Sequence, residues 1–260
     1  MKQKLTSRFG RASLLLVATL CASVTLTTTS SSTAQARPHK LAKKFERRLR
    51  GVDGIGLIGA KLNMQWASFS AELDNEQDRL LNDPSAMTSF GFGVTLDRAI
   101  NRYVGVRAEA LFQNKNFSHD SPPDYELKNA TAKVESETFL DYIEVPVGVL
   151  VRLMPGELIQ PYTSVGLYGA MLVNASGTQK GYGSNDNPFR PFSFFDYGWY
   201  LSAGSYFILA EGAGYLGAEL KYSQGLANIA DTSLELNKEE PLANQVYTAG
   251  NFALSVSYYF

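Results

Sequence analysis

The chain has 260 residues, of which 45% are hydrophobic and 19% are charged, and its formal net charge is −1. This composition excludes a disordered chain, and it differs from that of a protein built of transmembrane helices. Residues 37–50 contain seven basic groups and one acidic group, whereas residues 51–260 contain 13 basic and 24 acidic groups. An acidic body argues against nucleic-acid binding, which needs a basic face on the folded domain.

Residues 1–36 have the features of a cleaved secretory signal peptide. Four basic residues precede an apolar run over 12–26, and Ala34-Gln35-Ala36 has the small-x-small pattern that signal peptidase recognises. We therefore predict cleavage after Ala36. The only cysteine, Cys21, lies within this leader, so the mature chain is expected to have neither a disulfide nor a thiol nucleophile.

Residues 37–53 form a basic segment that follows the predicted cleavage site. Leu41, Phe45 and Leu49 recur every four residues, which places them on one face of a helix. Two interpretations remain open for this segment. It is either a solvated periplasmic tail or a short amphipathic helix on the inner leaflet of the outer membrane, where anionic groups would attract it.

Apolar residues alternate with small or polar residues from residue 54 to the end, a pattern typical of β-strands. The last stretch shows it most clearly, with Phe252, Leu254, Val256, Tyr258 and Phe260 on one face. Seven further strands are predicted within residues 56–66, 90–96, 104–113, 142–152, 162–173, 196–207 and 216–223.

Long and short connections between these predicted strands alternate. The long ones cover residues 71–85, 118–133, 176–191 and 229–245, and the short ones cover 97–101, 154–157 and 211–214. Outer-membrane barrels have short periplasmic turns and long extracellular loops. The sequence therefore predicts an all-β fold over residues 54–260: an eight-stranded antiparallel up-and-down transmembrane β-barrel. The alternative is a soluble barrel or β-sandwich, whose aliphatic face would point inward.

The face opposite the aliphatic residues carries both signs of charge. An eight-stranded barrel is just wide enough for side chains to fill it, and buried charges need partners. We therefore predict a plugged lumen with a polar network, and a narrow or gated pore remains an alternative. The residues predicted to form the network are Arg107, Glu109, Glu144, Arg152, Glu219 and Lys221.

Five motifs in chain order resemble the small outer-membrane β-barrel family of bacteroidetes that includes PorT. They are Tyr142-Ile143-Glu144-Val145-Pro146, Pro161-Tyr162 with Gly166 and Gly169, Asp196-Tyr197-Gly198, the stretch 221–229, and Tyr258-Tyr259-Phe260. The resemblance covers about residues 54–260 and implies an eight-stranded barrel in the outer membrane. Through PorT it also implies a role in type IX protein secretion as one open function. No catalytic residues are known for the family, so none are transferred.

One stretch has the spacing of a catalytic site. His119 and Ser121, with Glu126 nearby, resemble the residues of one lipid A deacylase type, but we predict that they lie in a loop, which cannot easily hold catalytic geometry. Asn185-Asp186-Asn187 lacks the spaced ligands and closing Glu of a calcium loop. The sequence therefore predicts no catalytic residue, no cofactor and no metal site.

We therefore predict a non-enzymatic protein that serves envelope structure, surface interaction or assembly of a secretion system. A narrow solute channel and a lipid-modifying enzyme are the alternatives. The expected partners are outer-membrane lipid and lipopolysaccharide, secretion-system components, and the barrel-assembly machinery, which in relatives reads terminal aromatic strands. In this chain that assembly signal would consist of Phe252, Tyr258 and Phe260.

Overall fold

The structure is a computed structural model that describes residues 36–52, 54–72, 82–121, 134–179, 183–185, 192–209, 214–228 and 246–260. Within these ranges the chain forms one α-helix and ten β-strands. They are α2 (Ala36–Leu49), β1 (Leu57–Glu72), β2 (Asn82–Ala86), β3 (Thr88–Ala99), β4 (Val104–Ser121), β5 (Val134–Arg152), β6 (Ile159–Gln179), β7 (Gly183–Asn185), β8 (Phe195–Ile208), β9 (Tyr215–Gly225) and β10 (Val246–Tyr259). The predicted signal peptide lies outside the described residues, apart from Ala36.

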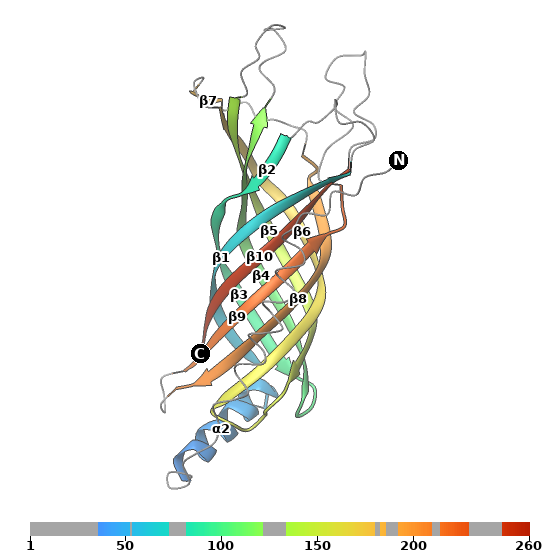
Figure 1. Ribbon diagram of the computed structural model, residues 1–260. Helices are drawn as coiled ribbons and strands as arrows, with labels where there is room; N and C mark the ends of the chain where they lie inside the picture. Colours follow the sequence, from blue (N-terminus) through green and yellow to red (C-terminus); the bar gives the residue numbers. More distant parts are fainter. Residues whose placement is uncertain are drawn as a thin grey trace, which may run out of the picture.

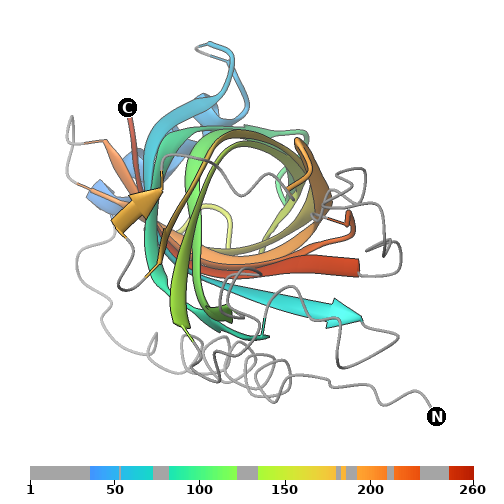
Figure 2. The same ribbon diagram turned by 90° about the horizontal axis from the view of Figure 1, so that it is seen from above.

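Eight of the strands close into an antiparallel barrel (Figures 1 and 2). The ring runs β1-β3-β4-β5-β6-β8-β9-β10, and pairing of β10 with β1 closes it. The short strand β2 pairs with β4, beyond the part of β4 that pairs with β3. The short strand β7 pairs with β6. The predicted eight-stranded antiparallel barrel is therefore confirmed.

The aliphatic residues of the barrel strands point outward. Val256 in β10 is 53% exposed and Phe260, directly after the strand, is 60% exposed, whereas Ser255 and Tyr259 on the opposite face are each 1% exposed. The same alternation holds on the other strands, for example at Val147 in β5. An outward apolar face around a closed barrel suits lipid and not water. The alternative of a soluble barrel with its aliphatic face inward is therefore wrong.

Aromatic side chains bound the outward apolar face near both ends of the barrel, as in transmembrane barrels. The end with the short turns, α2 and the C-terminus is called the turn end, and the opposite end is called the extended end (Figure 1). Exposed aromatics near the turn end are Tyr103, Phe207, Tyr258 and Phe260, and those toward the extended end are Phe90, Phe92, Phe195, Tyr197 and Trp199.

Beyond the aromatic residues of the extended end, the outer face becomes polar. The carboxylate of Asp141 in β5 accepts hydrogen bonds from Asn114 in β4 and from Asn174 in β6, the latter at 3.0 Å. This row marks the limit of the lipid-facing surface on these three strands.

Three neighbouring strands, β4, β5 and β6, are 18, 19 and 21 residues long. Roughly nine to eleven residues suffice to cross a bilayer at a tilt, so these strands continue past the membrane. The predicted loop starts at 118 and 176 are therefore wrong. Pairing between neighbours, such as His119 with Ser136 and Thr138 with Gly177, extends the strands through polar sequence. The predicted turn at 97–101 also begins too early, because β3 runs to Ala99.

Glycines at the β5–β6 seam make room for an aromatic side chain inside the barrel. Gly148 faces Gly166 across the two strands, and the ring of Tyr200 lies over both. A Cβ on Gly166 would lie 2.6 Å from the Cα of Gly148 and 2.7 Å from Cε1 of Tyr200. Gly148 and Gly166 therefore leave no space for a side chain.

We expect Gly166→Ala to destabilise the folded barrel by about 1–3 kcal/mol, the usual cost of overpacking a filled core. Urea unfolding of the purified protein in detergent micelles measures this loss. Gly169→Ala is the matched control on the same strand, because a Cβ there meets nothing within 4 Å. Equal stability of the two variants would contradict the packing described here.

Helix α2 packs against the turn end of the barrel (Figure 1). Phe45 and Leu49 are buried, and the ring of Phe45 lies 4.8 Å from that of Tyr215 and 5.3 Å from that of Tyr206. Neither predicted interpretation of this segment, a solvated tail or a helix lying on lipid, included this contact with the barrel. No helix in the described part of the chain has both the length and the apolarity of a membrane span.

The C-terminus of α2 is closed by backbone geometry that glycine permits. Gly51 has φ of 70°, its N–H donates to the carbonyl of Arg48 at 2.9 Å, and the N–H of Val52 donates to the carbonyl of Arg47 at 3.1 Å. This double hydrogen bond is the Schellman motif, in which the left-handed residue is usually glycine. It turns the chain from the helix toward β1.

Candidate functional site

Side chains fill the barrel interior in three layers. Toward the extended end lies a mainly apolar cluster made of Ala67, Phe117, Leu140, Tyr142, Tyr168, Ala170 and Ala249. At the turn end lies a second cluster, made of Phe45, Leu49, Leu57, Ala99, Leu150, Tyr162, Tyr206, Tyr215 and Tyr259. Charged side chains occupy the space between these two clusters.

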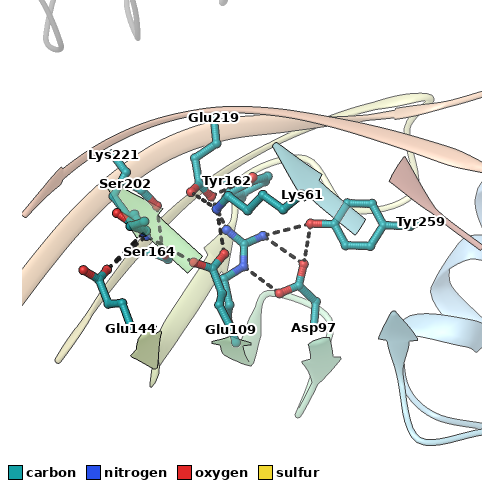
Figure 3. A network of polar contacts seen from close by, with 12 residues as sticks. Lys61, Asp97, Glu109, Glu144, Tyr162, Ser164, Ser202, Glu219, Lys221 and Tyr259 are labelled. Atoms are coloured by element: carbon teal, nitrogen blue, oxygen red, sulfur yellow. Dashed lines mark hydrogen bonds and ion pairs between the residues drawn. The ribbon is translucent and has the colours of Figure 1, made fainter. Parts of the chain in front are cut away.

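Arg107 is the centre of the charged layer near the turn end, where it pairs with Asp97 and Glu219, both labelled in Figure 3. Its guanidinium donates from Nε and Nη2 to the two carboxylate oxygens of Asp97 at 2.6 and 2.8 Å, and from Nη1 to Glu219. The hydroxyls of Tyr206 and Tyr259 donate to the same Asp97 at 2.7 and 3.0 Å. A bidentate arginine–carboxylate pair is among the strongest polar contacts in proteins.

Two lysines continue the layer through the middle of the barrel. Nζ of Lys61 lies 2.6 Å from Glu109 and 2.7 Å from Glu219, and so joins β1 to β4 and β9. Nζ of Lys221 lies 3.2 Å from the other oxygen of Glu109 and 3.8 Å from Glu144. Each lysine therefore lies between two carboxylates.

A third lysine ends the layer beneath the apolar cluster of the extended end. Nζ of Lys115 lies 2.9 Å from Asp196 and 3.6 Å from Glu144. It also lies 4.8 Å from the ring centre of Tyr142 and 5.1 Å from that of Tyr168. Cation–π contacts of this kind add to the attraction of the lysine for its carboxylates.

These contacts form one continuous series of alternating charge, which we call the charged series. No member is more than 4% exposed, and the series draws on six strands. Since an unpaired buried charge is costly, alternation gives every inner member two partners of opposite sign. In order from the turn end, the members are Asp97, Arg107, Glu219, Lys61, Glu109, Lys221, Glu144, Lys115 and Asp196.

All six residues that the sequence predicted for the lumen face inward, and each is at most 4% exposed. Five of them belong to the charged series. The sixth, Arg152, lies at the turn end, where Nη1 donates to Glu46 of α2 at 2.6 Å and Nη2 to the carbonyl of Asn101 at 3.1 Å. Arg152 therefore holds the helix and a turn together.

Sequence reasoning missed four members of the charged series: Lys61, Asp97, Lys115 and Asp196. Asp97 and Lys115 were missed because the predicted strands ended too early, although both continue the two-residue alternation of Thr95 and Gln113. Lys61 and Asp196 lie within the predicted strands at 56–66 and 196–207 but were not assigned to the network.

The aromatic residues of the predicted assembly signal lie on the outer face of β10 or, for Phe260, directly after it. Tyr258 and Phe260 are exposed near the turn end, with ring centres 6.0 Å apart. Phe252 lies farther along the strand beside Trp66, also at 6.0 Å. Their position leaves them accessible from outside the barrel.

The catalytic and metal alternatives gain no support from the described residues. β4 runs to Ser121, so His119 and Ser121 belong to a strand and not to the predicted loop. Their side chains lie outside the described residues, as do Glu126, Asp186 and Asn187. Within the described ranges, no group of three or more His, Cys, Asp or Glu residues is arranged to hold a metal ion.

A closed barrel with an apolar belt outside and paired charges inside defines an integral membrane protein of the outer-membrane class. Residues 35–231 match the family model described as "Outer membrane protein beta-barrel domain". The chain belongs to this family, and the protein is an integral β-barrel of the bacterial outer membrane. By the general topology of such barrels, the turn end faces the periplasm and the extended end faces outward.

Solved structures give weaker resemblances. The outer membrane protein OprG from Pseudomonas aeruginosa is 14% identical, with a TM-score of 0.44 over 78% of this chain and 94% of that chain. Ail of Yersinia pestis is 14% identical, with a TM-score of 0.35 over 79% of this chain and 99% of that one. Comparison with curated proteins gave no match.

Proposed function

We propose that the protein is a non-conducting, non-enzymatic outer-membrane barrel that serves envelope structure or surface interaction. The observation that supports this proposal is the charged series, which crosses the lumen between the two mainly apolar clusters. Within the described residues, buried side chains of α2, of the two clusters and of the charged series follow one another from the turn end to the cluster of the extended end.

The energetics of the charged series oppose passage of a hydrated solute. Breaking a buried ion pair by removing one partner costs about 3–5 kcal/mol, because a buried charge loses its compensation. A path through this lumen would separate several pairs together, for example those that join Lys61 to Glu109 and Glu219. Thermal opening of such a path would therefore be rare.

A role in assembly of a secretion system is a finer form of the proposal. Its support is the resemblance of the motifs at 142–146, 196–198 and 221–229 to the PorT-containing family. Affinity purification from detergent-solubilised envelopes tests it. Co-purification of secretion-system components would support this role, and their absence under mild detergent conditions would argue for a purely structural barrel.

Planar bilayer recordings test the closed lumen. We expect no discrete conductance steps from the wild-type protein, because the charged series fills the passage. The variant Glu109→Ala/Lys221→Ala removes one acid and one base, keeps the net charge, and should allow measurable ion flow through the vacated volume. Channel activity of the wild type equal to that of this variant would contradict the proposal.

The enzymatic alternative makes a separate prediction. We expect His119→Ala to leave the acyl composition of lipid A unchanged in the producing bacterium, since the proposal assigns no reaction to this side chain. Mass spectrometry of extracted lipid A measures the composition. A reproducible gain or loss of an acyl chain would support a lipid-modifying enzyme instead.

A further inference from the structure

Helix α2 has two opposite faces, and only one of them is used by the barrel. Ala42, Phe45 and Leu49 are buried, whereas Lys40, Lys43 and Lys44 are exposed. Successive residues turn by about 100° around a helix of 3.6 residues per turn, so the three lysines lie on the side opposite the buried residues. We call these lysines the basic stripe.

The direction of the basic stripe follows from how the helix packs. Because the apolar side of α2 contacts Tyr206 and Tyr215 at the barrel end, the basic stripe faces away from the barrel and into the periplasm. The ion pair of Glu46 with Arg152 and the hydrogen bonds at Gly51 fix the orientation of the helix. The stripe is therefore held by the fold and is not part of a free tail.

Two arginines, one at the end of β3 and one in the turn that follows, extend the positive surface. Arg98 is exposed and lies against the end of α2, since a Cβ on Gly51 would be 3.4 Å from its Nε. Arg102 is also exposed, and it donates to the carbonyl of Pro155 at 3.4 Å. Glu46, the acid of α2, is paired with Arg152.

The lysines of the stripe have no acidic partner within the described ranges. None of Lys40, Lys43 and Lys44 forms an ion pair there, although residues 51–260 carry an excess of acids. A concentrated positive surface on an otherwise acidic protein attracts anionic partners. Lipid is a poor fit for this partner, because insertion of α2 into a leaflet would need the apolar face that the barrel already covers.

We propose that the basic stripe binds the carboxylate-bearing cell-wall polymer of the periplasm, peptidoglycan, and so ties the barrel to the layer beneath it. The stripe presents three ammonium groups along less than two turns of helix, on the face opposite the one that the barrel covers. The closed lumen plays no part in this binding, so the conductance experiment neither supports nor weakens it.

Co-sedimentation of the detergent-solubilised mature protein with purified peptidoglycan sacculi tests the proposal. We expect Lys40→Gln/Lys43→Gln/Lys44→Gln to lower the bound fraction roughly tenfold, at a few tenths to one kcal/mol per exposed ion pair. The matched control, Lys40→Arg/Lys43→Arg/Lys44→Arg, keeps the charge and should keep binding. Salt of about 1 M should release the wild type, because it shortens the screening length to about 3 Å.

A second measurement separates the cell wall from the membrane as the source of anions. The protein is placed in nanodiscs of zwitterionic or of anionic phospholipid, and co-sedimentation is repeated. Equal binding in both discs is expected if the stripe faces away from the bilayer. Loss of binding in anionic discs would mean that lipid headgroups occupy the lysines, and it would overturn the proposal. Wild-type binding by the glutamine variant, or no wild-type binding at all, would overturn it as well.

Discussion

Arg107→Met is expected to destabilise the barrel by about 3–5 kcal/mol, the cost of removing one partner from a buried ion pair. The substitution keeps most of the side-chain volume but leaves Asp97 and Glu219 without their shared cation. Both carboxylates are at most 4% exposed, so water cannot easily replace the guanidinium. Urea unfolding in detergent micelles, followed by tryptophan fluorescence, measures the loss.

Two further variants define the origin of this effect. Arg50→Met removes an exposed arginine and should change stability by less than about 0.5 kcal/mol. In the double variant Arg107→Met/Glu219→Gln, one of the two carboxylates that lose Arg107 is itself removed, so that only Asp97 is left without this cation. A stability cost smaller than the sum of the single substitutions would show coupling between the two residues. If Arg107→Met behaved like the exposed control, the interior would be wet and the charged series would not fill it.

Deletion of Phe260 is expected to prevent assembly of most of the protein into the outer membrane and to leave it in the periplasm. The side chain is 60% exposed, so its loss removes little from the packed interior. Its backbone N–H donates to the carbonyl of Ile58 at 3.1 Å, at the seam where β10 closes the barrel on β1. The expected defect therefore lies in recognition of the last strand by the assembly machinery.

Cell fractionation with electrophoresis of unheated samples distinguishes assembled from unassembled protein. Phe207→Ala is the matched control, because Phe207 is a partly exposed aromatic near the same end on β8. Purified protein lacking Phe260 should still fold in detergent, which separates failed recognition from failed folding. Normal amounts of the deletion variant in the outer membrane would refute the assembly signal proposed for β10.

The ends of the strands show where sequence reasoning was insufficient. Polar sequence such as Ser118-His119-Asp120-Ser121 was interpreted as a loop, but in the folded chain it pairs with β5 on one side and partly with β2 on the other. Backbone hydrogen bonds between adjacent strands form whatever the polarity of the side chains. A long strand therefore continues as far as the strands beside it. Because the predicted strands also ended before Asp97 and Lys115, these two residues were left out of the predicted network.

Helix α2 shows a similar limit. The four-residue spacing of Leu41, Phe45 and Leu49 indicated a helix, and its basic composition suggested either solvent or lipid as its surroundings. The tyrosines that it contacts, Tyr206 and Tyr215, lie more than 150 residues away in the chain. The local sequence pattern of the helix contains no information about which residues it contacts.

Local alternation of side chains was enough to establish the eight strands and the difference between their two faces, because the two faces of a strand differ already at the level of neighbouring residues. The outward direction of the aliphatic residues was predicted from the alternation of long and short connections. Which charges meet inside was decided only by closure of the barrel. Lys61 reaches Glu219 across 158 positions of sequence because β10 brings β1 and β9 to either side of itself. Strand register and barrel stagger set such distances, and neither is encoded in any single strand.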